Sequence, residues 1–104
     1  MDATDIGAFR DLYHMCLECL KTDVDTAVRF LVILSGECEQ TIKGGFLSDA
    51  GLKEMFSLHK RVLLAAAPYH FESYLLYVEW NREPEKKFYP PRRGGLKQVV
   101  DALQ

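Results

Sequence analysis

The residues of this 104-residue chain that most readily do chemistry are its three cysteines and three histidines. A structural zinc ion needs four such ligands. His14, Cys16 and Cys19 are close enough in the sequence to provide part of a site, and Cys38 with one of the two later histidines could complete it. However, Cys16 and Cys19 belong to an apolar pattern with helical spacing, in which cysteine behaves as a small hydrophobic residue. We therefore predict that the cysteines pack in a core and that no metal is bound.

The two later histidines, His59 and His70, are candidates for a general base. Nucleophilic catalysis requires such a base beside an activated serine or cysteine, and neither histidine has one at a recognisable spacing. We predict ordinary packed or surface histidines. Glu72 and Glu79 are two helical turns apart and could act as a carboxylate pair, but an ion pair of Glu79 with Arg82 at a helix end is the simpler interpretation. We expect no catalytic residue in this set.

Nucleotide hydrolysis needs a phosphate-binding loop, and the sequence contains neither Gly-x-x-x-x-Gly-Lys-Ser/Thr nor Gly-x-Gly-x-x-Gly. We therefore expect no independent enzymatic activity and no cofactor. The N-terminal sequence has no secretion signal, which favours free thiols in a reducing compartment. The apolar runs are too short to cross a bilayer, so we expect no membrane partner.

Charge is distributed unevenly along the chain. Residues 1–59 carry ten acidic and five basic side chains, whereas residues 60–104 carry five acidic and eight basic ones. In the second part, two adjacent aromatic residues precede two adjacent arginines, and aromatic planes beside cations suit bases and phosphates. We predict a nucleotide or nucleic-acid site made of Lys86, Lys87, Phe88, Tyr89, Arg92 and Arg93. The alternative is a loop held in place by its aromatic residues, with solvated arginines.

Hydrophobic periodicity predicts that helices carry most of these residues, and no segment has the alternation of a strand. We predict a helical hairpin over residues 5–45, with one helix from about Asp5 to Lys21 and another from Val24 to the Gly44-Gly45 pair.

A helical pair is predicted over residues 48–82. Ser48 is a good N-cap for a third helix, which Pro68 should end. Residues 83–104 are predicted to form a Pro-rich basic loop and a short helix that begins at Leu96. Together these elements predict a single all-α domain over residues 1–104, a small bundle of four to five helices.

The fourth predicted helix, over about residues 69–81, is rich in aromatic residues. Phe71, Tyr74, Leu75 and Val78 fall on one of its faces, and we predict that Phe71 and Tyr74 pack in the core. Tyr77 and Trp80 fall partly on another face. They either hold the Pro-rich loop against the helix or, together with Arg82, form a surface for a protein partner.

The second half of the chain also carries a longer pattern. It reads Ala67-Pro68, Phe71-x-x-Tyr74-x-x-Tyr77-x-Glu79-x-Asn81-Arg82, Phe88-Tyr89-x-Pro91-Arg92-Arg93, Leu96-Lys97 and Val100-x-x-Leu103. This pattern resembles the N-terminal region of the large terminase subunits of tailed phages of Gram-positive bacteria. The resemblance covers about residues 48–104 and extends only loosely to the first two helices.

In that family the segment is a helical lead-in to the motor that moves DNA into the procapsid, and it helps to frame the adenine side of the ATP site. The resemblance implies a non-catalytic module that binds the motor core, or nucleic acid or nucleotide, in the cytoplasm of the bacterial host. The positions expected to face nucleotide or DNA are Phe88, Tyr89, Arg92 and Arg93, with Gln98 and Gln104 as weaker candidates. The family's phosphate loop, Walker B acid and nuclease domain are absent from this sequence.

Two alternatives belong to other classes of protein. The acidic first half, the initial Met1 and the lack of a catalytic set suit a free-standing phage-encoded inhibitor of the anti-CRISPR type, which binds a host nuclease or defence complex. The basic loop near the C-terminus could instead bind DNA directly, and such binding would weaken steeply with salt.

Overall fold

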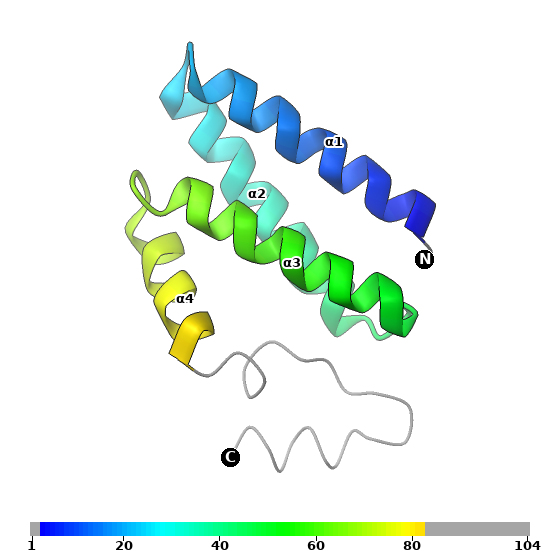
Figure 1. Ribbon diagram of the computed structural model, residues 1–104. Coiled ribbons are helices and arrows are strands. Elements are labelled where there is room, and N and C mark those ends of the chain that lie inside the picture. Colours follow the sequence, from blue (N-terminus) through cyan, green and yellow to red (C-terminus); the bar gives the residue numbers. More distant parts are fainter. Residues whose placement is uncertain (1–2, 83–104) are drawn as a thin grey trace.

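The computed structural model describes the backbone of residues 3–82 and the side chains of residues 6–82. Those residues form four α-helices and no strand (Figure 1): α1 is Ala3–Leu20, α2 is Val24–Lys43, α3 is Asp49–Ala66 and α4 is Phe71–Arg82. The all-α class is therefore confirmed for this part of the chain. The predicted Pro-rich loop and the predicted last helix fall within residues 83–104 and lie outside the described residues.

Local hydrogen bonds fix the starts of α2 and α3 where the sequence indicates them. The Asp23 carboxylate caps α2 by accepting hydrogen bonds from the Thr26 hydroxyl at 2.7 Å and the Thr26 backbone N–H at 3.2 Å. These two bonds hold the pKa of Asp23 below its ordinary value. Ser48 caps α3 by accepting the Gly51 N–H at 3.1 Å. Between the two helices, Gly45 adopts a φ of 75°, in the left-handed region that glycine tolerates best.

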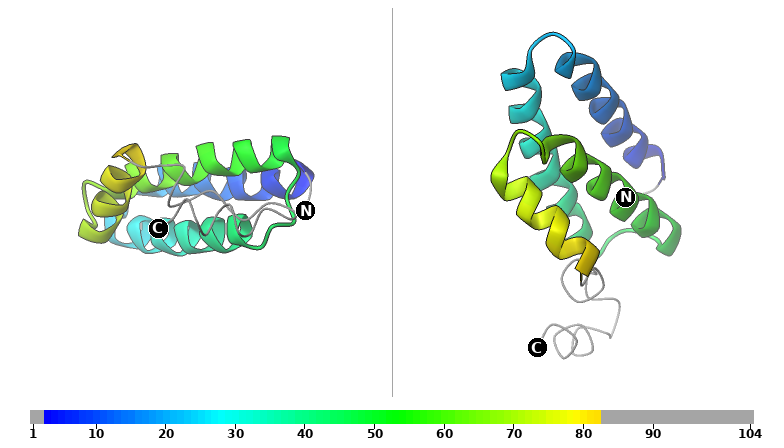
Figure 2. Two further views of the ribbon diagram at one scale, coloured as in Figure 1. Left: turned by 90° about the horizontal axis from the view of Figure 1, so that it is seen from below. Right: turned by 60° about the vertical axis from the view of Figure 1, so that its left-hand side comes forward.

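The helices form a compact bundle with α4 at one end of it. α1 and α2 run antiparallel as a hairpin, and α3 returns antiparallel to α2 (Figure 1). α1, α2 and α3 all contact one another, and α4 packs against α3. In the left view of Figure 2, α2 lies beneath α3, and α4 stands at the side where α3 ends. α4 thus begins beside the C-terminal end of α3 and folds back along it.

One hydrophobic core joins all four helices. Its largest fully buried apolar side chains are Ile6, Leu31, Cys38, Ile42, Met55, Val62 and Leu63. Cys16 is buried in the same core, so the prediction that cysteines pack inside is confirmed for Cys16 and Cys38, whereas Cys19 is half-buried.

The predicted core face of α4 is wrong. Phe71, Tyr74 and Leu75 are exposed, and the residues that α4 turns toward α3 are instead Ser73, Leu76, Tyr77 and Trp80. The physical reason is that α4 carries apolar side chains on both faces and only one face can meet α3. The face with the tryptophan buries the largest single apolar side chain, which favours this rotation of the helix.

Candidate functional site

His70 determines where α4 begins, and hydrophobic periodicity does not identify it as a helix cap. The Nδ1 atom of His70 accepts the backbone N–H of Ser73 at 3.3 Å and lies 2.9 Å from the Ser73 hydroxyl, which donates to it. The His70 carbonyl accepts the Tyr74 N–H at 3.1 Å and so begins the helix. His70 is therefore the N-cap of α4, in a position where serine or aspartate is more common. The bond also keeps Ser73, which is buried, on the side of α4 that faces the bundle.

The inner face of α4, formed by Ser73, Leu76, Tyr77 and Trp80, holds the helix on α3. Trp80 is 5% exposed. Its ring meets the His59 ring edge to face, with centroids 5.0 Å apart and an interplanar angle of 84°, and meets the Phe56 ring in the same way at 5.5 Å. Such edge-to-face pairs add stabilisation beyond the apolar area that they bury. They fix the rotation of α4 about its axis and thereby decide which side chains point outward.

The outer face of α4 consists of Phe71, Tyr74, Leu75 and Val78, spaced as one stripe along the helix. Phe71 is 71% exposed, Tyr74 49% and Leu75 44%, while Val78 is half-buried. The Phe71 and Tyr74 rings lie beside each other with centroids 6.4 Å apart. Phe71, Tyr74 and Leu75 therefore present an apolar and aromatic surface to solvent.

Acidic side chains lie along one edge of the outer face. Glu72 and Glu79 are both exposed, and the helical repeat places them on the same edge, about 20° apart around the axis. We call this pair the acidic edge. The opposite edge carries the uncharged Asn81, and the exposed Arg82 continues the stripe at the C-terminal end of α4. The surface therefore has an apolar centre and one negatively charged border.

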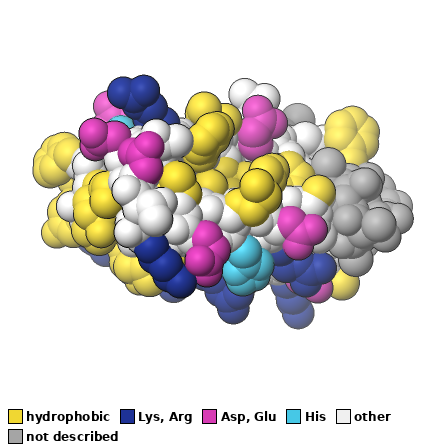
Figure 3. Space-filling model, turned by 90° about the horizontal axis from the view of Figure 1, so that it is seen from above, with side chains coloured by type: hydrophobic (Ala, Val, Ile, Leu, Met, Phe, Trp, Pro, Cys, Tyr) yellow, Lys and Arg dark blue, Asp and Glu magenta, His cyan; other side chains and the backbone are white. Residues whose placement is uncertain are grey.

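Other helices expose apolar side chains too, but less continuously. Leu12 and Met15 are exposed on α1, and Phe30 and Ile33 on α2. In Figure 3, hydrophobic side chains run along the middle of the face seen from above, with acidic and basic side chains beside them. Only α4, among the described helices, places four apolar residues along two successive turns of one exposed face, which is why it is the candidate site.

The histidine that packs on Trp80 also makes a polar contact between α2 and α3. Its Nε2 atom lies 2.9 Å from the Ser35 hydroxyl, and His59 is 1% and Ser35 8% exposed. Burial lowers the pKa of His59 to about 4, so the ring is neutral at pH 7. A serine beside a neutral histidine has the composition of a nucleophile and its base. Both side chains are buried, however, and a substrate could not reach them in this conformation. The contact therefore joins two helices.

The sequence could not reveal this pair, because Ser35 and His59 are 24 residues apart. His59 is packed in the core, which is one of the two placements predicted for it. The expectation that it has no nearby serine is corrected by the fold, since packing of α2 on α3 brings one within hydrogen-bonding distance.

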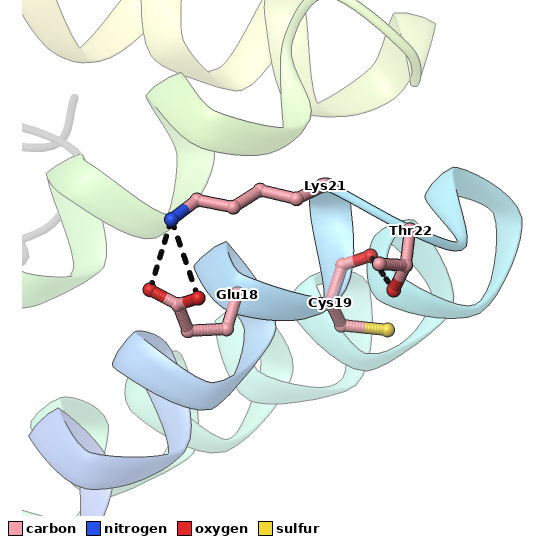
Figure 4. A network of polar contacts seen from close by, with 4 residues as sticks. All are labelled: Glu18, Cys19, Lys21 and Thr22. Atoms are coloured by element: carbon pink, nitrogen blue, oxygen red, sulfur yellow. Dashed lines mark hydrogen bonds and ion pairs between the residues drawn. The ribbon is translucent and has the colours of Figure 1, made fainter.

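The cysteines show no zinc site within the described residues, where no group of three or more His, Cys, Asp or Glu side chains is placed to hold a metal. Burial raises the pKa of the Cys38 thiol to about 12 and also raises that of Cys16. At the end of α1, the Cys19 carbonyl accepts the Thr22 hydroxyl at 3.4 Å, beside an ion pair of Lys21 with Glu18 at 3.1 Å (Figure 4). Cys19 thus helps to close the turn between α1 and α2.

The sequence-predicted site residues have different outcomes. Of the expected partner surface, Arg82 is exposed, Tyr77 is half-buried, and Trp80 is buried in the core instead of lying on the surface. Trp80 and Tyr77 contact the bundle because they share the inner face of α4. The predicted nucleotide or nucleic-acid residues lie outside the described residues: Lys86, Lys87, Phe88, Tyr89, Arg92 and Arg93.

Comparison with known proteins gives no relative for this site: no protein-family model, curated protein or solved structure matches the chain. Among the described residues, no helix is both long and apolar enough to cross a membrane.

Proposed function

We propose that this chain is a non-catalytic helical module that binds another protein through the outer face of α4. The observation that carries the proposal is that α4 is apolar on both of its faces, and the described residues cover only one. An apolar helix face is normally turned toward a core or a partner. Exposed aromatic and apolar side chains arranged as a continuous surface are typical of interaction sites.

The residue types on this surface also suit a protein partner. Fully burying a side chain such as phenylalanine or leucine contributes roughly 1.5–3 kcal/mol. Phe71, Tyr74 and Leu75 all have surface left to bury, and aromatic residues are frequent among the few side chains that dominate binding energy. The hydrogen-bonded start of α4 and the Trp80 contacts hold this surface in place, so little ordering is needed on binding.

The resemblance to the N-terminal region of phage terminases supplies the first candidate partner. In this proposal the module binds the ATPase core of a DNA-packaging motor, with the basic residues between Lys86 and Arg93 available for nucleotide or DNA. The bacterial cytoplasm is the compartment in which such a motor works.

A second candidate function is inhibition of a host nuclease or defence complex by a free-standing phage protein. The observation that favours it is the charge of the described part, in which residues 3–82 contain eleven acidic and eight basic side chains. An acidic protein surface can occupy a basic groove that normally holds nucleic acid. This function predicts competition with nucleic acid, whereas the first predicts binding to a terminase core.

The experiment is a binding measurement on the full chain by biolayer interferometry. The immobilised probes are the ATPase core of a large terminase from a phage of Gram-positive bacteria and, separately, a host nuclease complex. We expect Leu75→Ser to weaken binding to the true partner about tenfold, a loss of about 1.4 kcal/mol. The matched control is Leu64→Ser, because Leu64 is an exposed leucine on α3 that lies outside the outer face.

Binding to the terminase core that falls in Leu75→Ser and not in Leu64→Ser supports the first candidate. Binding to the nuclease complex with the same pattern, together with displacement by nucleic acid, supports the second. Equal loss in the two variants would show that the outer face is not the binding surface, and binding to neither probe would overturn both candidates.

A further inference from the structure

His59 lies at the junction of three helices and connects α4 to the rest of the bundle. It belongs to α3, its Nε2 atom lies 2.9 Å from the Ser35 hydroxyl of α2, and its ring meets the Trp80 ring of α4. We propose that protonation of His59 releases α4 from the bundle as a unit, while α1, α2 and α3 remain packed on one another. Such a release concerns the inner face of α4 and does not depend on what binds the outer face.

A charge on His59 would appear inside the contact that holds α4 in place. The ring is 1% exposed, its centroid lies 5.0 Å from that of Trp80, and Trp80 in turn lies 5.5 Å from Phe56. A buried imidazolium loses hydration that neighbouring aromatic rings do not replace. Separating Trp80 from His59 would let water reach the ring and remove this penalty.

α4 is the described helix with the weakest attachment to the bundle. It packs mainly against α3, whereas α2 packs against both α1 and α3. Its buried side chains are Ser73 and Trp80, while α2 and α3 each contribute a longer row of buried side chains to the core. Elements with few buried apolar contacts open at a lower free energy than the core. Loss of the Trp80 contact should therefore free α4 before the other helices separate.

The turn between α3 and α4 can serve as the hinge. It consists of residues 67–70, in which the backbone N–H groups of Tyr69 and His70 both donate to the Ala66 carbonyl, at 3.0 and 2.9 Å. Figure 1 shows α4 at one end of the bundle, joined to α3 through this turn. The hydrogen bonds from His70 to Ser73 lie at the start of α4 itself, so the helix can move without losing them. A change in a few backbone angles at such a position is sufficient for a hinge motion.

The titratable groups of α2 and α3 near His59 do not reverse the effect of its burial. Burial lowers the pKa of His59 to about 4, while the Glu39 carboxylate on α2 acts more weakly in the opposite direction. The Cys38 thiol on α2 is buried and stays neutral, because its pKa is raised to about 12. On α3 the neighbouring cations are Lys60, which is half-buried, and Arg61, which is exposed.

α4 contributes a second histidine that can respond to acid. The Nδ1 atom of His70 accepts the Ser73 N–H at 3.3 Å, and a protonated Nδ1 could no longer accept this bond. The charged side chains beside Trp80 on α4 are Glu79 and Arg82, and both are exposed. The test must therefore separate the buried histidine of α3 from the cap of α4.

The test is amide hydrogen exchange of the full chain, followed by mass spectrometry at pH 7 and pH 5. Rates corrected for the intrinsic effect of pH give the opening equilibrium constant of each helix. We expect α4 to open more readily than α2, and its opening constant to rise about 20-fold between pH 7 and pH 5. This factor follows from a pKa of 6.5 for an exposed histidine and of about 4 for the buried His59.

Three variants assign the rise to one group. His59→Gln keeps a polar side chain beside Ser35 but does not titrate, and it should abolish most of the rise. His70→Asn keeps a cap that does not titrate, and it should retain the rise. Glu39→Gln removes the carboxylate that acts on His59 and should also retain it. Circular dichroism at both pH values checks that each variant keeps its helices.

Trp80 provides a second readout in the wild-type chain, because it is the only tryptophan of the sequence. On release of α4, its emission maximum should move to longer wavelength and acrylamide should quench it more strongly. As the pH is lowered, both changes should begin at a higher pH than the loss of the helical circular dichroism signal. This measurement does not require any variant to fold.

Four results would overturn the inference. An opening constant of α4 that does not change with pH would show that no buried group controls it. Equal protection of α4 and α2 at both pH values, or loss of the circular dichroism signal together with the Trp80 shift, would show that α4 separates only when the whole bundle unfolds. A rise that His70→Asn abolishes and His59→Gln retains would make the cap, and not the buried histidine, the group that responds to acid.

Discussion

The inner and outer faces of α4 carry similar side chains but differ in their surroundings. The inner face places Trp80 edge to face on His59 and Phe56, within the core. The outer face carries Phe71 and Leu75 into solvent. Hydrophobic composition alone does not decide which face of such a helix is inside. Packing against the bundle determines which face is buried, and the opposite face remains available for binding.

Replacing Trp80 tests the inner face and should have the largest effect. Trp80→Ala removes a buried aromatic side chain and leaves a cavity beside His59, so we expect the free energy of unfolding to fall by about 3–5 kcal/mol. Phe71→Ala is the control on the other face, and its expected effect is within about 0.5 kcal/mol. Urea denaturation followed by circular dichroism measures both. Similar losses in the two variants would mean that the faces are not distinguished in solution.

The buried His59 should make the bundle sensitive to acid. Its pKa is lowered to about 4 in the folded chain from an ordinary 6.5, mainly by burial, while the Glu39 carboxylate acts weakly in the opposite direction. Protonation therefore favours the unfolded chain, and stability is lost as the pH falls from about 6.5 toward 4. Between pH 7 and pH 5 this histidine should account for about 2 kcal/mol of lost stability.

The measurement compares urea unfolding of the wild-type chain and His59→Gln at several pH values. The glutamine keeps a polar group for Ser35 but does not titrate. Between pH 7 and pH 5 the His59→Gln variant should therefore lose about 2 kcal/mol less stability than the wild-type chain. Parallel curves for the two proteins would show that His59 is not held neutral by burial.

The cap of α4 should have a smaller effect. His70→Ala removes the acceptor of the Ser73 N–H, and loss of an N-cap interaction costs about 1 kcal/mol. We expect lower helicity and faster amide hydrogen exchange at the start of α4, with α1 and α2 unchanged. His70→Asn is the matched variant, because asparagine is a good N-cap and should restore the stability. If both variants lose stability equally, the ring of His70 acts by packing and not by capping.

Features of the fold that depend on neighbouring residues can be predicted from the sequence, whereas features that depend on packing between helices cannot. Ser48 marks the start of α3 through its side-chain hydroxyl, and Pro68 marks its end through its ring and missing N–H, so those boundaries follow from the sequence. The contact of Ser35 with His59 depends on packing between two helices, and no local pattern encodes it. The outer face of α4 escapes sequence analysis for the same reason, since periodicity predicts a core position for its aromatic residues and a partner surface at Tyr77, Trp80 and Arg82.

The smallest effect on stability is expected at Leu75, and the adjacent Leu76 allows a direct comparison of the two faces. Leu75 lies on the outer face and Leu76 on the inner face, where it packs against the core. Leu75→Ser and Leu76→Ser change helix propensity by the same amount, so the difference between them reports only what each leucine contacts. We expect Leu75→Ser to change the free energy of unfolding by about 0.5 kcal/mol or less, and Leu76→Ser to cost at least about 1 kcal/mol more.

Urea denaturation of the two variants measures this difference, and a binding experiment with the partner should rank them in the opposite way at matched folded fraction. Leu75→Ser would then be a nearly fully stable protein that binds poorly, which separates the role of the outer face in binding from its role in folding. Equal destabilisation by the two substitutions would mean that something covers Leu75 in the unbound chain. In that case the outer face would belong to the folded core, and the proposed binding surface would have to lie on another helix.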